Sequence, residues 1–190
     1  MLLTLVIVSA FRVAASLPVL RWPLAGALLA IAADLADLPL INLLDIGFMD
    51  HYQAWDKYID QVYMATFLVV AIRWGGALAH VAVALVAFRL VGIGLMEFRD
   101  GRELLLFFPN VFEFWFVAIA AVKHWRPSAQ PGYTAAVAIA AAVLPAKLFQ
   151  EWFLHHYRWL DNFTALEFLG NAWDGLTWPL REAFGAVSLL

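Results

Sequence analysis

The feature that most constrains this chain is a series of apolar segments, each close to the length that a helix needs to cross a bilayer. The hydrocarbon core is about 30 Å thick and an α-helix rises about 1.5 Å per residue, so one crossing takes about 20 apolar residues. The third segment is short, and we expect its helix to begin in the membrane interface near Gln53. The pattern predicts an all-α fold, a polytopic transmembrane helical bundle with six spans at about residues 2–20, 23–44, 58–72, 77–96, 104–122 and 133–153.

The composition points to the same class and excludes several others. Hydrophobic residues make up 64% of the chain and charged residues 14%, whereas soluble domains have about 45–50% and about 25%. The absence of cysteine excludes a disulfide scaffold. A net charge of −3 argues against a surface that follows a phosphate backbone. We therefore expect an integral membrane protein whose partner is membrane lipid and which binds no nucleic acid.

The chain divides into a transmembrane bundle over residues 1–156 and a C-terminal segment over residues 157–190. The C-terminal segment carries large apolar residues at helical spacing, interleaved with Asp161, Glu167 and Asp174. This pattern predicts an amphipathic helix that lies in the membrane interface. A seventh partial span, or a contact surface for a partner, is the alternative.

The orientation follows from the basic residues in the loops. Residues 2–20 lack a preceding basic region, so we interpret them as a true span and not as a secretory signal. An even number of spans puts both termini on one side of the membrane. The loops on the side of the termini hold five basic residues and those on the other side hold four. We therefore expect the termini on the cytoplasmic side of a bacterial-type inner membrane.

Several ionisable residues fall inside the nominal spans. Each costs about 2.5–3.5 kcal/mol on insertion scales, so each needs a partner or a function. The group comprises Arg12, Asp34, Asp37, His80, Arg89, Glu113, Lys147 and Glu151.

Aspartates near the second and third spans form two pairs at helical spacing. Asp34 and Asp37 are three residues apart and Asp56 and Asp60 are four apart, so each pair shares one helix face. A helical hairpin would bring the pairs together, and converging carboxylates repel each other unless a cation lies between them. Oxygen ligands of this kind suit Mg²⁺ or Mn²⁺. The spacing predicts a divalent metal site.

This arrangement resembles the CDP-alcohol phosphotransferases, six-helix membrane enzymes that build phospholipids and carry the motif D-x2-D-G-x2-A-R-x8-G-x3-D-x3-D. The match covers about 27 residues, with one extra residue between the second and third aspartates. The resemblance implies that Asp34, Asp37 and Asp56 are metal ligands. It implies that Asp60 is the general base on the incoming alcohol or a further ligand.

The chain departs from that motif at the positions that contact the nucleotide. Leu38 and Tyr52 stand where the family has glycines, and Ile41-Asn42 stands where it has Ala-Arg. A plainer interpretation of the aspartates is also open: Asp34 and Asp37 mark the end of a span, and later aspartates belong to a solvated loop. The aromatic belt of that loop would be Tyr52, Trp55, Tyr58 and Tyr63.

A second polar group is expected between the last two spans. Lys147, Glu151 and His155 recur every four residues and form a stripe on one helix face. Lys147 either pairs internally with Glu151 or contacts an anionic headgroup or phosphate, for which Arg89 is the second basic candidate. Glu113 should pair with Arg89 or with Lys147. Glu113, Glu151 and His155 together would form a structural charge network.

Three functional hypotheses follow from these residues. The first is a metal-dependent phospholipid transferase that uses the aspartate cluster. The second is an accessory subunit, as a homodimer or in a larger membrane complex, with haem or pigment bound at His80 or His155. The third is a small transporter that uses Arg89, Glu113 and Lys147 as a charge network.

Overall fold

The computed structural model describes residues 2–36, 52–99, 107–157 and 177 of the chain. The described residues form six α-helices and one short 3-10 helix and contain no strand, which confirms the all-α prediction for this part of the chain. In chain order the elements are α1 (Leu2–Ser16), η1 (Leu17–Leu20), α2 (Pro23–Leu35), α4 (Tyr52–Trp74), α5 (Gly76–Arg99), α7 (Val111–Trp125) and α8 (Tyr133–Tyr157).

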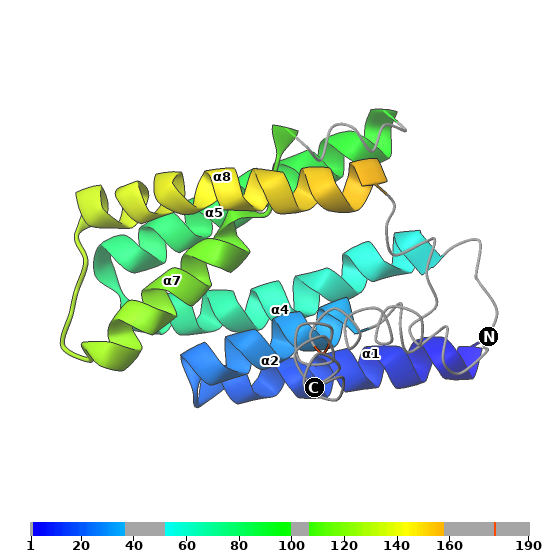
Figure 1. Cartoon of the computed structure of the whole chain (residues 1–190), viewed down its shortest axis with the longest axis horizontal. Helices are drawn as coiled ribbons and strands as arrows, with labels where there is room; N and C mark the ends of the chain where they lie inside the picture. Colours follow the sequence, from blue (N-terminus) through cyan, green and yellow to red (C-terminus); the bar gives the residue numbers. More distant parts are fainter. Residues whose placement is uncertain (1, 37–51, 100–106, 158–176, 178–190) are drawn as a thin grey trace, which may run out of the picture.

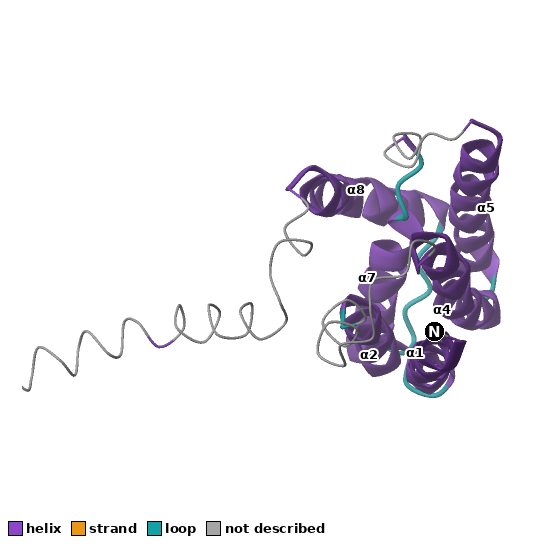
Figure 2. Ribbon diagram, turned by 90° about the vertical axis from the view of Figure 1, so that its right-hand side faces the viewer, coloured by secondary structure: helices purple, strands orange, loops and turns teal. Residues whose placement is uncertain are grey.

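The helices lie side by side along the long axis of the molecule (Figure 1). Seen from the end, α8 and α5 lie on one side, α2 and α1 on the other, and α7 and α4 between them (Figure 2). Contacts between α7 and α8, α2 and α7, α4 and α5, and α1 and α4 agree with this arrangement. The two inner helices therefore carry most of the core.

Two predicted helix boundaries change in the structure and a third is confirmed. The second helix ends at Leu35 and not near residue 44, because the chain turns at Ala36. The third begins at Tyr52, as expected for a start near Gln53. The fifth begins at Val111 and not near residue 104, because Pro109 has no amide hydrogen to continue a helix. Apart from Tyr157, the last residue of α8, and Thr177, the predicted interfacial segment at 157–190 lies outside the described residues.

The turn between α1 and α2 depends on a glycine. The backbone N–H of Trp22 donates to the Pro18 carbonyl at 2.8 Å, and Pro23 begins α2, where its missing N–H costs nothing. The chain then folds back so tightly that a Cβ at Gly26 would overlap the backbone of Val19 and Pro18. Only glycine allows this approach.

Aromatic side chains of α4 and α7 fill the core. Phe67 stacks on Phe116 with ring centroids 4.4 Å apart, and Trp74 stacks on the same ring at 5.0 Å. Trp115 is fully buried, and its indole N–H donates to the Ala136 carbonyl of α8 at 2.9 Å. This bond satisfies the polar end of a large apolar side chain and ties α7 to α8.

The exterior is apolar over long stretches. The stretches Gly76–Leu95 of α5 and Tyr133–Trp152 of α8 are each long and apolar enough to cross a membrane. Only 28% and 11% of their apolar windows are buried within the molecule, so most of these residues face outward. The exposed side chains include Val83, Phe88, Leu90, Val91, Val137, Leu148 and Phe149.

We expect Gly26→Ala to lower the free energy of unfolding by about 1–3 kcal/mol, as overpacking usually does. The matched control is Gly94→Ala in α5, where a Cβ would meet nothing within 4 Å. There the better helix propensity of alanine should stabilise by up to about 1 kcal/mol. Thermal unfolding followed by circular dichroism measures both, and equal melting temperatures for the two variants would contradict the close approach.

Candidate functional site

The first of two charge clusters joins α1, α2 and α4. Arg12 of α1 is only 5% exposed, and its Nη2 donates to Oδ1 of Asp34 on α2 and to Oδ1 of Asp60 on α4. The two carboxylates are partly buried, with 28% and 27% of their side chains exposed. One guanidinium therefore joins three helices that are far apart in the sequence.

This cluster contains one member of each predicted aspartate pair. Asp34 and Asp60 converge, as the helical hairpin predicted, whereas Asp37 and the side chain of Asp56 lie outside the described residues. The positive charge beside the two carboxylates belongs to Arg12. The sequence singled out Arg12 as a charge within a span but assigned it no partner.

A divalent metal does not fit the described half of this cluster. Within the described ranges, no group of three or more His, Asp or Glu residues could hold a metal ion. Asp34 and Asp60 share one guanidinium, which would repel a metal ion placed beside them. The Mg²⁺ or Mn²⁺ site stays a prediction that rests on the other two aspartates.

The second cluster lies where α7 begins, against α8. Nζ of Lys147 is 2.8 Å from Oε2 of Glu113 and 4.0 Å from Oε1 of Glu151, and all three side chains are buried. Lys147 also donates to Oε1 of Gln150 at 2.8 Å and lies over the Phe114 ring at 5.1 Å from its centroid. Two carboxylates thus share one buried ammonium.

A break in the backbone brings these groups together. The N–H of Val111 donates to the Pro109 carbonyl at 2.8 Å across Asn110, whose φ of −75° and ψ of 64° describe a tight three-residue turn. The backbone N–H of Asn110 donates to Oε1 of Glu151 at 2.9 Å. The carboxylate of Glu151 therefore lies at the start of α7, where the helix dipole stabilises negative charge.

Arg89 of α5 stabilises the backbone just before this break. Its Nη1 donates to the Phe108 carbonyl at 2.7 Å, which supplies a partner to a carbonyl next to the interruption. Of the two partners expected for Glu113, the structure selects Lys147 and not Arg89. The expected Lys147–Glu151 pair is also present, at the longer distance.

Two oxygen atoms of the second cluster are buried without a hydrogen-bond donor among the described residues. They are Oδ1 of Asn110 and Oε2 of Glu151. Leaving a buried acceptor unpaired costs about 1–3 kcal/mol, and more for a charged group. Both atoms belong to side chains that are at least nine-tenths buried. These two oxygen atoms could therefore accept a further hydrogen bond or bind a cation.

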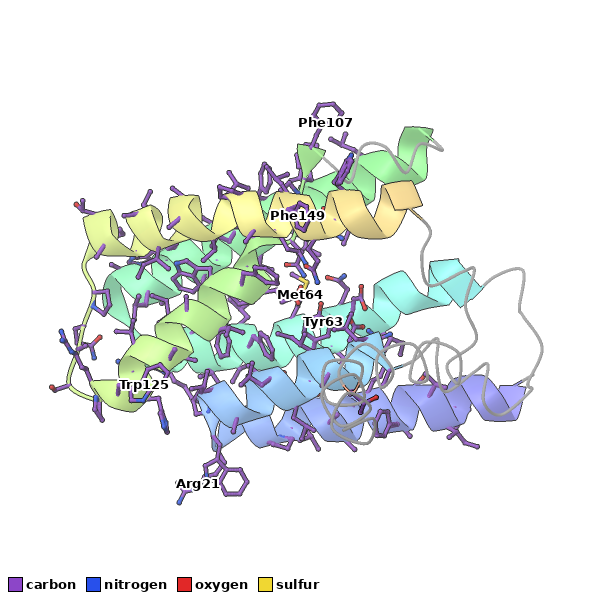
Figure 3. The ribbon with its side chains drawn as sticks, viewed as in Figure 1. Arg21, Tyr63, Met64, Phe107, Trp125 and Phe149 are labelled. Atoms are coloured by element: carbon purple, nitrogen blue, oxygen red, sulfur yellow. The ribbon has the colours of Figure 1, made fainter. Side chains whose placement is uncertain are left out.

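Tyr63 of α4 lies between the two clusters. Its hydroxyl is 3.4 Å from Nδ2 of Asn110, and it is within electrostatic range of Glu113 on one side and of Asp60 and Asp34 on the other. Figure 3 shows Tyr63 and Met64 on the part of α4 that faces α7 and α8. The expectation that Tyr63 belongs to an interfacial aromatic belt is wrong, because its side chain is buried.

The remaining predicted groups lie elsewhere. His80 is exposed near the start of α5, where its Nδ1 shares a hydrogen bond with the Tyr133 hydroxyl. His155 belongs to α8, but its side chain lies outside the described residues. Of the stripe predicted on α8, the described part is the pair Lys147 and Glu151, and both members face α7.

We expect Lys147→Met to destabilise the protein by about 3–5 kcal/mol, because it leaves buried carboxylates without their counter-charge. The double variant Lys147→Met/Glu113→Gln should recover much of that loss. Lys123→Met is the matched control, since Lys123 is only partly buried and donates to the Ala129 carbonyl at 3.0 Å. Denaturant unfolding measures all three, and a loss of equal size in the control would contradict the special position of Lys147.

We expect Mg²⁺ and Mn²⁺ to leave the melting temperature of the wild-type protein unchanged, because the Arg12 guanidinium that bonds both Asp34 and Asp60 repels a metal ion beside them. Titration of the wild type and of Asp60→Asn with each metal, read as thermal stability, tests this. A metal-dependent rise in the wild type that Asp60→Asn abolishes would instead establish the predicted metal site.

The described residues thus place two charge clusters on either side of Tyr63, each with two carboxylates and one basic side chain, and the second also has unpaired acceptors. One cluster depends on Arg12 and the other on Lys147. No protein-family model, curated protein or solved structure matches this chain.

Proposed function

We propose that the protein is a polytopic integral membrane protein that binds and releases a single positive charge at the start of α7, as a small cation transporter. The observation that carries the proposal is the pair of buried, unpaired acceptors on Asn110 and Glu151. The positive charge is a proton or a monovalent metal ion, since both suit the same oxygen atoms.

The exterior of the bundle supports the membrane part of the proposal. Apolar side chains cover the outside of α5 and α8 over lengths that match a bilayer. In water such surfaces would favour aggregation. The shorter apolar stretches Val6–Leu20 and Pro23–Leu35 also expose large side chains, among them Ile7, Leu28 and Leu29. A lipid environment satisfies all of these surfaces.

The charge balance of the second cluster supports a monovalent cation. Glu113 and Glu151 carry two negative charges when ionised and Lys147 carries one positive charge, so the group is one positive charge short of neutral. One bound monovalent cation makes the cluster neutral, whereas a divalent ion would give it a net positive charge. The first cluster has the same charge balance, with Arg12 against Asp34 and Asp60. What distinguishes the second cluster is that, among the described residues, Asn110 and Glu151 keep buried acceptor atoms without a donor.

The backbone break supports a transport role. Irregular backbone at membrane depth is tolerated where it is buried in protein or lines a cavity, and interrupted helices commonly form the ion sites of transporters. Here Pro109 and Asn110 are non-helical and buried, and the Asn110 N–H already holds the Glu151 carboxylate. A small movement of α8 against α7 would change the contacts of Glu151 without breaking a regular helix.

The test is cation flux in proteoliposomes under an imposed gradient, with a lumenal pH dye for protons and an indicator for Na⁺. We expect flux in the wild type. Glu151→Gln should weaken cation binding by about ten- to a hundredfold, because a charge-assisted contact is worth about 1.5–3 kcal/mol. Glutamine keeps the size of the side chain and still accepts from the Asn110 N–H, so the fold should persist.

Asp34→Asn is the matched control, since it removes a carboxylate from the other cluster. Flux that depends on Glu151 but not on Asp34 supports the site at the start of α7. Flux that survives Glu151→Gln would overturn the site, and no flux in the wild type would overturn the function.

A phospholipid transferase is the second candidate, because Asp34 and Asp60 do converge. The metal titration described above separates it from the transporter. A homodimer or larger complex, and haem or pigment at His80 or His155, stay predictions.

A further inference from the structure

One end of the bundle gathers basic and tryptophan side chains. We call it the basic end, formed by residues 17–26, 71–80 and 121–133, which lie at the left of Figure 1. In each of the three segments a basic residue stands beside a tryptophan. The group comprises Arg21-Trp22, Arg73-Trp74, and Lys123, Trp125 and Arg126.

Two contacts join the three segments into one surface. Nη1 of Arg73 donates to the Leu20 carbonyl at 3.4 Å, and Nζ of Lys123 lies 5.9 Å from the centroid of the Trp74 ring. Arg21 and Trp125 project away from the helices (Figure 3). Trp22 and Trp125 are 63% and 73% exposed, so large aromatic surfaces stand free at this end.

The basic end contains no carboxylate in its three segments. The whole chain has 15 acidic residues, and none of them falls within residues 17–26, 71–80 or 121–133. The four Lys and Arg residues there therefore have no carboxylate partner from their own or the neighbouring turns. Within these three segments the formal charge is purely positive.

Two other stretches of the sequence carry the reverse balance. Residues 37–60 contain five Asp against one Lys, and residues 97–103 contain three acidic residues against two Arg. The basic end thus differs in charge from the other stretches that hold several basic or acidic residues. Anionic lipids attract basic residues at a membrane surface, and acidic neighbours within a Debye length cancel that attraction.

We propose that the basic end lies in the anionic cytoplasmic leaflet of the membrane. Its four cationic side chains contact lipid phosphates, and Trp22 and Trp125 lie at the level of the headgroups, which suits an amphipathic ring. The partner is the anionic phospholipid surface. This inference rests on the membrane embedding in the proposed function, but not on cation transport.

The proposal reverses the orientation expected from counting basic residues alone. α1 begins at the end of the bundle opposite the basic end (Figure 1). Leu2 would then face the outer side of the membrane. Five basic residues against four favoured the other placement because the count ignored the acidic residues that surround the five.

Single cysteines test the orientation cleanly, because the chain has none of its own. Ser128→Cys places a thiol in the exposed loop before α8, and Leu2→Cys places one at the start of α1. In intact bacterial cells, a membrane-impermeant maleimide should label Leu2→Cys, and it should label Ser128→Cys only after permeabilisation. The opposite pattern, or equal labelling of both in intact cells, overturns the proposal.

The lipid preference tests the same surface in reconstituted vesicles. Quenching of tryptophan fluorescence by brominated phosphatidylglycerol is compared with quenching by brominated phosphatidylcholine. The double variant Arg21→Gln/Arg126→Gln should lose preference for the anionic lipid by up to about fivefold for each charge. Arg99→Gln/Arg102→Gln, which stand among acidic residues, is the control and should keep the preference.

An unchanged preference in the double variant overturns the proposal. Recovery of the protein from the soluble fraction would overturn the membrane embedding together with this inference. Correct labelling and lipid preference without cation flux would leave the inference standing and remove only the transport function.

Discussion

The pairing of Lys147 with Glu113 is the interaction on which the interior of this protein depends. An ammonium group taken out of water into an apolar bundle costs several kcal/mol unless a carboxylate meets it. The Lys147–Glu113 ion pair holds α8 against α7 at one level of the bundle. The hydrogen bond from Trp115 to the Ala136 carbonyl joins the same two helices at a second level. The aromatic core can then pack around α7 with no unpaired positive charge inside it.

The same rule organises the other half of the bundle. Arg12 draws α2 and α4 to α1 through Asp34 and Asp60, so each half has its own buried ion pair. The two clusters differ in whether all of their buried oxygen atoms accept a hydrogen bond. Each cluster sets one basic side chain against two carboxylates, but in the second Glu151 keeps a buried oxygen without a donor among the described residues. That difference is why we propose the second cluster, and not the first, as the cation site.

Much of this arrangement can be predicted from residue spacing. The helices follow from the apolar segments, and the approach of Asp34 to Asp60 follows from a hairpin of two helix faces. For the ion pair of Glu113, the sequence left two possible partners, Arg89 and Lys147. The contacts of Arg12, Asn110 and Tyr63 could not be predicted, because they join different helices. Spacing along one helix carries no information about its rotation against another.

The sequence by itself determined the class of structure and the presence of buried charge, because apolar length and residue type are properties of the chain alone. Only the tertiary structure decided which charges meet. Whether a carboxylate binds a metal, a guanidinium or a transported cation depends on what the neighbouring helices place beside it. For Asp34 and Asp60 that neighbour is Arg12. For Glu151 it is the turn at Asn110, since Pro109 interrupts the helix and turns a backbone N–H toward the carboxylate.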